Sequence, residues 1–175
     1  MEVELVRYPT LRDWRLVKRA TLETVGLTPK TPPSREWMEQ LLRARHSPIR
    51  ILQFVFELRD IPYWVSTHLV RHVHATPFVK SQRNDRQNKY DRNKAPQDTP
   101  VNMMWCMNAE ELMVVCSKRL CKQASPETRA VVQEIKNLVI KKCPEFADVL
   151  KPACEWQGGI CYEINGCKKA ESKHE

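Results

Sequence analysis

Polar and apolar residues alternate along short stretches of the chain, and elsewhere apolar residues recur at helical spacing. Residues 2–8 alternate and predict a strand, and the β-rich run ILQFVFEL at 51–58 predicts a second, buried strand. Each predicted helix follows a residue whose side chain can cap a first turn. These residues are Thr10, Ser34, Asp60, Asn108 and Ser125. The pattern thus predicts two strands and five helices in mixed order.

The ends of these helices are less sharply marked than their beginnings. The first is expected to run to about Val25 and to be closed by Gly26. The third is expected to extend to about His74, and the fourth to Lys122. The fifth carries its apolar stripe at helical spacing, through Val131, Ile135, Leu138 and Val139.

The segments between these elements are loops and a tail. Residues 28–33 are a Pro-rich connector, and residues 82–100 are polar, basic and expected to form a long loop. Residues 144–175 are expected to be an irregular, cysteine-containing tail. Because strands and helices are separated and no repeat is present, the sequence predicts a single α+β domain over residues 1–175.

Length and composition narrow the class of protein. The chain has 175 residues and no apolar run of about 20, so no transmembrane helix is expected. Its first residues, MEVELVRYP, lack the pattern of a signal peptide, and we expect a cytoplasmic protein. In that compartment, seven cysteines are expected to be thiols or metal ligands.

The spacing of the cysteines gives only a weak metal signal. Four lie late in the chain, with ten, six and five residues between them, which is not a CxxC pattern. This late group is Cys143, Cys154, Cys161 and Cys167. We expect no metal site, and we expect the other three to be packing thiols. Those three are Cys106, Cys116 and Cys121.

Glycine and charge decide how the protein would bind phosphate. The chain has only four glycines, too few and too scattered for a P-loop or a dinucleotide fingerprint. Its net charge of +8 favours an anionic partner, although an inert basic surface is the simpler alternative. Any phosphate is therefore expected to meet side-chain cations or helix N-termini.

Arg119 stands out because it shares a helix face with apolar residues. Leu112, Val115, Cys116 and Arg119 are spaced i, i+3, i+4 and i+7. A guanidinium does not stay unpaired on such a face. It must extend to solvent, pair with an internal acid or await an anionic ligand.

A second cationic group lies between residues 68 and 94. His68 and His72 are spaced i, i+4, which suits a metal pair, but neither a zincin glutamate nor an obvious third ligand accompanies them. The alternative is a helix end that presents Arg71 and imidazoles to an anion. From residue 71 to 94, seven Lys or Arg face two Asp, a composition that suits either a solvated loop or a nucleic-acid-binding loop. Phe78 and Tyr90 would be available there for stacking.

The order of these features resembles the flavin-dependent thymidylate synthases. Their signature, Arg-His-Arg, seven residues, then Ser-x-Arg, is matched by Arg71-His72-Val73, HATPFVK and Ser81-Gln82-Arg83. Upstream, His46 and Pro62 fall where the family has a histidine and a proline. Downstream, the family's Arg-x-x-x-Pro resembles Arg92-NKA-Pro96, and its Trp-x-x-Asn-x-x-x-Leu…Arg helix resembles the segment from Trp105 to Arg119. The resemblance covers about residues 40–167.

The resemblance implies an antiparallel sheet with packed helices, a homotetramer, and active sites where subunits meet. It implies FAD as cofactor, dUMP as substrate, and NADPH and methylenetetrahydrofolate as co-substrates for dTMP formation. Arg119 and Ser81 would be catalytic, with Arg119 stabilising the uracil deprotonated at N3. Further dUMP contacts would come from His68, Arg71, Gln82, Arg83 and Arg92, and FAD contacts from His46, Arg71, His72, Val73 and Asn108.

The sequence also departs from the family pattern, chiefly around the flavin. Val73 replaces the third signature residue, an arginine, and His68 replaces a glutamine. Phe78 and Val79 stand where the family has Asn-Glu, and Ile51 stands where it has Glu. The leading hypothesis is therefore a divergent flavin-dependent thymidylate synthase. The alternatives are a non-catalytic nucleotide or single-stranded nucleic-acid-binding protein on the same scaffold, and a flavoenzyme that modifies another pyrimidine nucleotide.

Overall fold

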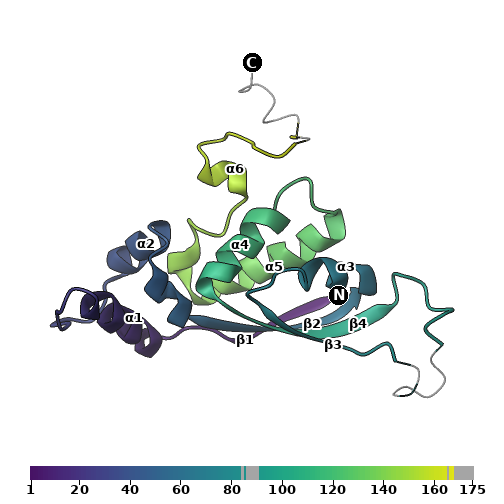
Figure 1. The fold of residues 1–175 in the computed structure, drawn as a ribbon, viewed down its shortest axis with the longest axis horizontal. Coiled ribbons are helices and arrows are strands. Elements are labelled where there is room, and N and C mark those ends of the chain that lie inside the picture. Colours follow the sequence, from purple (N-terminus) through teal and green to yellow (C-terminus); the bar gives the residue numbers. More distant parts are fainter. Residues whose placement is uncertain (84, 86–90, 165, 168–175) are drawn as a thin grey trace.

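The computed structural model describes residues 1–83, 85, 91–164 and 166–167 and has an α+β fold (Figure 1). Four antiparallel strands form one sheet in the order β1-β2-β4-β3. The strands are β1 (Glu2–Arg7), β2 (Gln53–Pro62), β3 (Thr76–Val79) and β4 (Pro100–Asn108). The fold class and the antiparallel sheet expected from the sequence are both confirmed.

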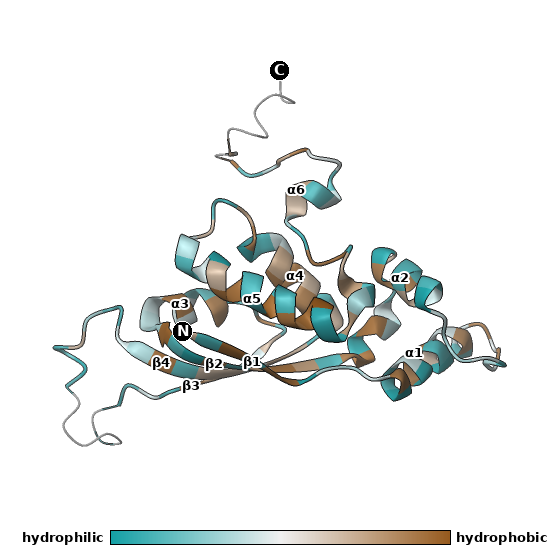
Figure 2. Ribbon diagram, turned by 180° about the vertical axis from the view of Figure 1, so that it is seen from behind, coloured by the Kyte–Doolittle hydropathy of each residue, from teal (hydrophilic) through white to brown (hydrophobic). Residues whose placement is uncertain are grey.

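Helices pack over one face of this sheet and beyond one of its ends (Figures 1 and 2). They are α1 (Leu11–Glu23), α2 (Arg35–Arg43), α3 (Tyr63–Leu69), α4 (Ala109–Arg119), α5 (Pro126–Lys142) and α6 (Ala153–Trp156). Two short 3-10 helices are also present, η1 (Ser47–Ile51) and η3 (Pro144–Phe146). α3 and α1 lie towards opposite ends of the molecule in both views.

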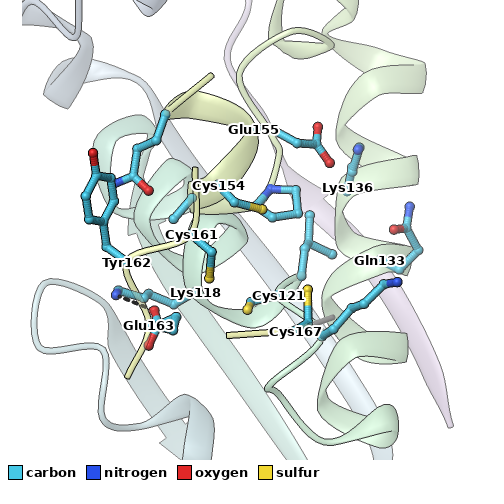
Figure 3. Close-up of a pocket in the computed structure, with 15 residues that line it drawn as sticks. Lys118, Cys121, Gln133, Lys136, Cys154, Glu155, Cys161, Tyr162, Glu163 and Cys167 are labelled. Atoms are coloured by element: carbon cyan, nitrogen blue, oxygen red, sulfur yellow. Dashed lines mark hydrogen bonds and ion pairs between the residues drawn. The ribbon is translucent and has the colours of Figure 1, made fainter. Parts of the chain in front are cut away.

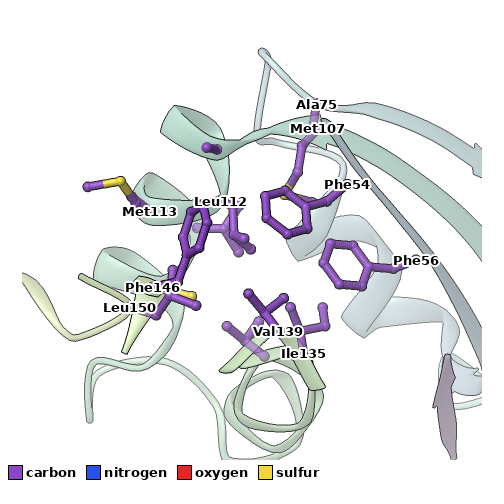
Figure 4. Packing of buried hydrophobic residues seen from close by; sticks show 14 of the residues in the cluster. Phe54, Phe56, Ala75, Met107, Leu112, Met113, Ile135, Val139, Phe146 and Leu150 are labelled. Atoms are coloured by element: carbon purple, nitrogen blue, oxygen red, sulfur yellow. The ribbon is translucent and has the colours of Figure 1, made fainter. Parts of the chain in front are cut away.

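The core lies between the sheet and these helices. Alternate residues of β2 are buried, so one side of this strand faces α4 and α5. Phe54 stacks on Phe56 and meets Phe146 edge to face, with ring centroids 5.3 Å apart (Figure 4). Burial of these rings stabilises the packing of the helices on the sheet.

Four of the five predicted caps are confirmed. Asp13 accepts hydrogen bonds from the amide and hydroxyl of Thr10 at 2.7 Å, which closes the first turn of α1. The side chains of Ser34, Asn108 and Ser125 each accept from a backbone amide three residues on.

The predicted cap at Asp60 is wrong. Asp60 lies within β2, where it adopts φ = +52° at an irregularity in the pairing with β4. The strand therefore continues to Pro62, and α3 begins only at Tyr63. Proline at this position fixes φ and lacks an amide, so it suits the end of the strand and the beginning of the helix.

The limits of other elements also differ from the sequence expectation. α3 ends at Leu69, so residues 71–74 form a turn, and Val73 is 82% exposed rather than part of the apolar face. β2 begins at Gln53, because residues up to Ile51 form η1. β3 and β4 were not predicted at all, although β4 alternates buried and exposed residues along its length.

The segment expected to be an irregular tail begins inside the core. η3 follows α5 directly, and Phe146, Val149 and Leu150 are fully or almost fully buried. Glu145 accepts a hydrogen bond from the indole of Trp14 at 2.8 Å, which ties this segment to α1.

Among the described residues, no helix is long and apolar enough to cross a membrane.

We predict that Phe146→Ala will lower the free energy of unfolding by about 3–5 kcal/mol, because it removes a fully buried ring from the core. Chemical denaturation followed by tryptophan fluorescence measures this change. Phe78→Ala, at a ring that is 60% exposed, is the matched control and should cost less than about 1 kcal/mol. Equal, small effects of both substitutions would mean that residues 144–150 do not belong to the core.

Candidate functional site

Arg119, at the end of α4, is held by the segment that follows α3. Its Nε donates to His72 Nε2 at 3.0 Å, and its Nη2 donates to the main-chain oxygen of His68 at 2.9 Å. That oxygen belongs to the last turn of α3, where carbonyls lack helical partners. The guanidinium therefore neither extends freely to solvent nor pairs directly with an acid, the first two outcomes considered from its position on the helix face.

A buried carboxylate completes this arrangement behind His72. Glu111 Oε1 lies 3.2 Å from His72 Nδ1, and the two side chains are only 5% and 7% exposed. Because His72 Nε2 accepts from Arg119, the proton of the neutral ring lies on Nδ1 and is donated to Glu111. Glu111, His72 and Arg119 thus form one hydrogen-bonded chain, which is called here the α4 relay.

Burial and charge shift the pKa of each member of the relay. Desolvation, and then the charge of Arg119, lower the pKa of His72 to about 4, so the imidazole is neutral at pH 7. Burial raises the pKa of the Glu111 carboxyl. Burial, followed by repulsion from Arg71, lowers the pKa of Arg119, although a guanidinium remains a cation. A carboxylate so close to His72 would favour its protonation, but a proton on Nε2 would break the bond from Arg119.

Glu111 is the site residue that sequence reasoning missed. Asn108 and Glu111 have the spacing of a capping box, which assigns a local role to both side chains. The structure keeps half of this motif, since Asn108 Oδ1 accepts from the Glu111 amide at 2.9 Å. The Glu111 carboxylate is directed to His72 instead. The contact between Glu111 and His72, a histidine of the predicted signature, could be recognised only once the position of the segment after α3 was known.

A cavity of about 540 Å³ lies beside the relay, at the beginning of α4. It is lined by Arg45, Arg50, His74, Asn108, Glu110, Glu111 and Val114. Three of these residues are basic and two are acidic, and Arg50 donates to Glu110. The cavity therefore contains basic groups that suit phosphate and an amide that can form hydrogen bonds. Its two carboxylates nearly balance the charge of the basic groups.

The other predicted substrate residues lie on the loop after β3. Arg83 forms an ion pair with Asp85, and its amide donates to Ser81 Oγ at 3.3 Å. The hydrogen bond from Arg83, and more weakly the charge of Arg92, lower the pKa of Asp85, which places these groups near one another. Within the described part of the chain, Arg119 contacts His72 and His68 and forms no hydrogen bond with this loop group.

The predicted flavin residues are divided in the same way. His72 belongs to the α4 relay, and Asn108 lines the adjoining cavity. His46, Arg71 and Val73 are exposed. Gln82, which was predicted to contact dUMP, is half-buried on the loop after β3. The expectation placed on each of these side chains remains a prediction, because a single chain does not test contacts across subunits.

The two candidate metal ligands, His68 on α3 and His72 just after it, form other contacts. His68 Nδ1 lies 3.4 Å from the hydroxyl of Thr128, at the beginning of α5, and His72 is committed to the relay. Among residues 1–83, 85, 91–164 and 166–167, no group of three or more potential ligands is arranged to hold a metal ion.

The four cysteines that lie together in the fold are not the four that lie late in the sequence. Cys121, Cys154, Cys161 and Cys167 line one cavity of about 560 Å³ beside α6 (Figure 3). Cys143 lies elsewhere, buried against the main chain of Pro9. Burial raises the pKa of both Cys116 and Cys143 to about 12, so these two thiols stay protonated and act as packing groups.

Comparison with known proteins identifies relatives of this fold. The model of the Thy1 family, described as thymidylate synthase complementing protein, matches residues 87–145. The structure is similar to that of the flavin-dependent thymidylate synthase ThyX from Helicobacter pylori complexed with FAD and dUMP, with 17% identity and a TM-score of 0.69. A second structure of Helicobacter pylori ThyX with FAD and dUMP gives 16% identity and a TM-score of 0.68. Both matches cover 86% of this chain and 100% of the other. Comparison with curated proteins gives no significant match.

We predict that His72 makes stability depend on pH between about 6.5 and 4. Its pKa is lower in the folded chain, so the unfolded chain binds more protons in this range, and the free energy of unfolding falls as the pH is lowered. The loss is at most about 3 kcal/mol at 1.36 kcal/mol per pH unit. The raised pKa of Glu111 acts in the opposite direction, because its protonation favours the folded chain.

Urea denaturation at a series of pH values measures this effect. His72→Gln should lose less stability than the wild type between pH 6.5 and 4. The exposed His46 provides the control, and His46→Gln should follow the wild-type profile. Parallel profiles for wild type and His72→Gln would contradict the assignment of a neutral, buried imidazole.

Proposed function

We propose that this divergent member of the Thy1 family of flavin-dependent thymidylate synthases binds a pyrimidine nucleotide at Arg119 and converts dUMP to dTMP. The observation that carries the proposal is the half-buried guanidinium of Arg119, which is fixed at the end of α4 by His72 and His68. The sequence resemblance expects the substrate arginine at this residue. In this proposal the carbon unit comes from methylenetetrahydrofolate, and NADPH supplies the reducing equivalents.

The way Arg119 is held leaves part of its guanidinium available. Nε and one hydrogen of Nη2 are directed to His72 and to His68. Nη1 has no hydrogen-bond partner among the described residues, and Nη2 has a second hydrogen. These groups lie along one edge of a planar, permanently charged fork, which can donate two parallel hydrogen bonds to the edge of an anionic uracil ring. Such bonds favour the ring that has lost its N3 proton over the neutral ring.

The residues of the cavity beside α4 fit an anionic cofactor in part. Arg45 and Arg50 supply positive charge for a diphosphate, and His74 and Asn108 supply an imidazole and an amide. Glu110 offsets one of these charges through its pair with Arg50. FAD, when bound there, would supply the hydride that reduces the transferred carbon unit. The role of this chain would be to orient the ring beside the substrate and to keep water from it.

The loop group motivates the proposed homotetramer. Ser81, Arg83 and Arg92 match substrate residues of the family, yet they are not joined to Arg119 within the described part of one chain. A second copy of the chain would supply these residues and complete the site. Arg83, which pairs with the Asp85 carboxylate within one chain, would then exchange this partner for the phosphate of dUMP. We propose that the enzyme is cytoplasmic.

A non-catalytic nucleotide-binding protein is the second candidate. It is favoured by the exposure of Val73 and Phe78, which stand at family flavin positions and are 82% and 60% exposed. A flavoenzyme acting on another pyrimidine nucleotide would keep the α4 relay but change the base. Thermal shifts with a panel of pyrimidine nucleotides, with and without FAD, separate these alternatives from dUMP methylation.

We predict that Arg119→Gln will weaken dUMP binding by about 10–100-fold, the loss expected for hydrogen bonds from a charged donor. Isothermal titration calorimetry of the FAD-reconstituted protein measures the affinity, and tritium release from labelled dUMP measures turnover. Arg129→Gln is the control, because Arg129 also donates to main-chain carbonyls, at Lys122 and Ala124, but lies outside the site. A protein that takes up no flavin and binds no dUMP would overturn the proposal.

We predict that Glu111 acts as a positioning residue for Arg119 through His72. Glu111→Ala leaves the Nδ1 hydrogen of His72 without its acceptor, which favours the tautomer that is protonated on Nε2. The Nε2 hydrogen of His72 would then face the Nε hydrogen of Arg119, and the hydrogen bond between the two side chains would be lost. The expected result is about tenfold weaker dUMP binding and about 1–3 kcal/mol lower stability. Glu111→Gln retains an acceptor and should restore most of the affinity. Equal affinities for both variants would exclude this role, and Glu110→Ala controls for loss of a neighbouring carboxylate.

A further inference from the structure

A groove lined by cations lies at the end of the molecule that carries α1, away from α3 (Figures 1 and 2). It has a volume of about 470 Å³ and runs between α1 and the Pro-rich connector of residues 28–33. Its cationic lining residues are Arg15, Lys18, Arg19 and Lys30, and no acidic residue lines it. None of these residues belongs to the proposed dUMP or FAD site.

The wall of this groove is fixed by contacts that hold the connector on α1. Lys18 Nζ donates to Thr31 Oγ1 and to the main-chain oxygen of Pro32, both at 3.2 Å. The same ammonium group lies over the ring of Trp37, at 5.7 Å from its centroid. Pro33 is buried behind it, and proline restricts the backbone of the connector. The groove is therefore a built feature in which Lys18 has a structural role.

The other three cations have no counter-ion among the described residues. Within that part of the chain, Arg15, Arg19 and Lys30 form no side-chain hydrogen bond or ion pair. The nearby acids are engaged differently: Asp13 bonds to Thr10 at the cap of α1, and Glu39 on α2 pairs with arginines of its own helix. Glu23 follows Arg19 by one turn without forming an ion pair with it among the described contacts.

Several other surface arginines do have acidic partners. They pair with carboxylates within 4 Å. These paired arginines are Arg35, Arg43, Arg50 and Arg59. Unneutralised like charges that share one groove repel one another, and a bound anion removes that repulsion.

We propose that this groove is a second anion site, which binds phosphate esters of a nucleotide or of a single-stranded nucleic acid. Arg15 and Arg19 are spaced i, i+4, so both guanidinium groups project from one face of α1 and can each donate two hydrogen bonds to phosphate. Leu16, 48% exposed in the same groove, offers an apolar contact for a sugar or a base. The site is independent of the proposed enzymatic function, because it shares no residue with it.

Fluorescence anisotropy with a labelled 12-nucleotide oligodeoxythymidylate tests this proposal, over a series of salt concentrations. The double variant Arg15→Gln/Arg19→Gln should bind at least tenfold more weakly than the wild type. The slope of log Kd against log salt should fall by about 1.4, the value for two phosphate contacts on a single strand. Both side chains are exposed, so thermal denaturation and dUMP binding should stay unchanged.

The matched control removes the same charge beside the groove. Arg7 and Arg12 are exposed, lie on β1 and α1, and do not line the groove. Arg7→Gln/Arg12→Gln should weaken binding less than about threefold. Equal losses in the two double variants, or no binding by the wild type in 50 mM salt, would overturn the proposal.

Competition with pyrophosphate distinguishes the source of the phosphate. Displacement of the oligonucleotide by pyrophosphate in the wild type, reduced in Arg15→Gln/Arg19→Gln, would indicate a site for small phosphate compounds. Displacement only by unlabelled oligonucleotide would indicate a site for the nucleic-acid backbone. Loss of dUMP binding by Arg119→Gln with oligonucleotide binding intact would show that the two sites are separate.

Discussion

A guanidinium at the edge of the core must be held by partners, and the structure of the site follows from how Arg119 is held. Glu111 and Arg119 are eight residues apart on α4, about 12 Å along the helix axis, yet both contact the imidazole of His72. The ring therefore lies along α4 and joins its first turn to its last. The same contacts fix the turn after α3, since Arg119 also binds the carbonyl of His68. The end of α3, the beginning of the cavity and Arg119 are thus parts of one unit.

The charge of this unit explains why a histidine, and not a second acid, lies next to the arginine. A carboxylate in direct contact with Arg119 would neutralise it and compete with an anionic ligand. His72 is neutral, so it accepts a hydrogen bond from Arg119 without cancelling its charge. Glu111 contacts the opposite side of the His72 ring from Arg119, so it orients the ring while Arg119 keeps its attraction for an anion. The relay therefore separates the orientation of the guanidinium from its neutralisation.

Local patterns in the sequence predicted much of the fold, and long-range contacts account for the rest. Thr10, Ser34, Asn108 and Ser125 were identified as caps because a cap depends on a few neighbouring residues. β4 was missed because its Met-rich alternation is a weak strand signal without its partner β2. Asp60 was taken for a cap because the same residue type also tolerates the left-handed conformation found in β2.

The site shows the same division between local and long-range information. The stripe that ends in Arg119 was visible because helical spacing alone places it beside Leu112 and Cys116. The role of Glu111 was not visible, because its partner His72 lies 39 residues away and an ordinary capping box accounted for the spacing.

The partners of the arginines bear on where the two proposed anion sites lie on a basic surface. A chain with four glycines lacks the backbone loops that usually bind phosphate, so its cations have to do this work. Within the described part of the chain, five surface arginines pair with neighbouring carboxylates, which accounts for part of the charge without any ligand; they are Arg35, Arg43, Arg50, Arg59 and Arg83. Arg119 is instead held by neutral partners, and Arg15 and Arg19 line a groove without acids. Net charge alone does not separate these groups. An arginine without an acidic partner retains its full attraction for phosphate or for an anionic ring, and Arg15 and Arg19 combine this state with a groove, which Arg7 and Arg12 do not line.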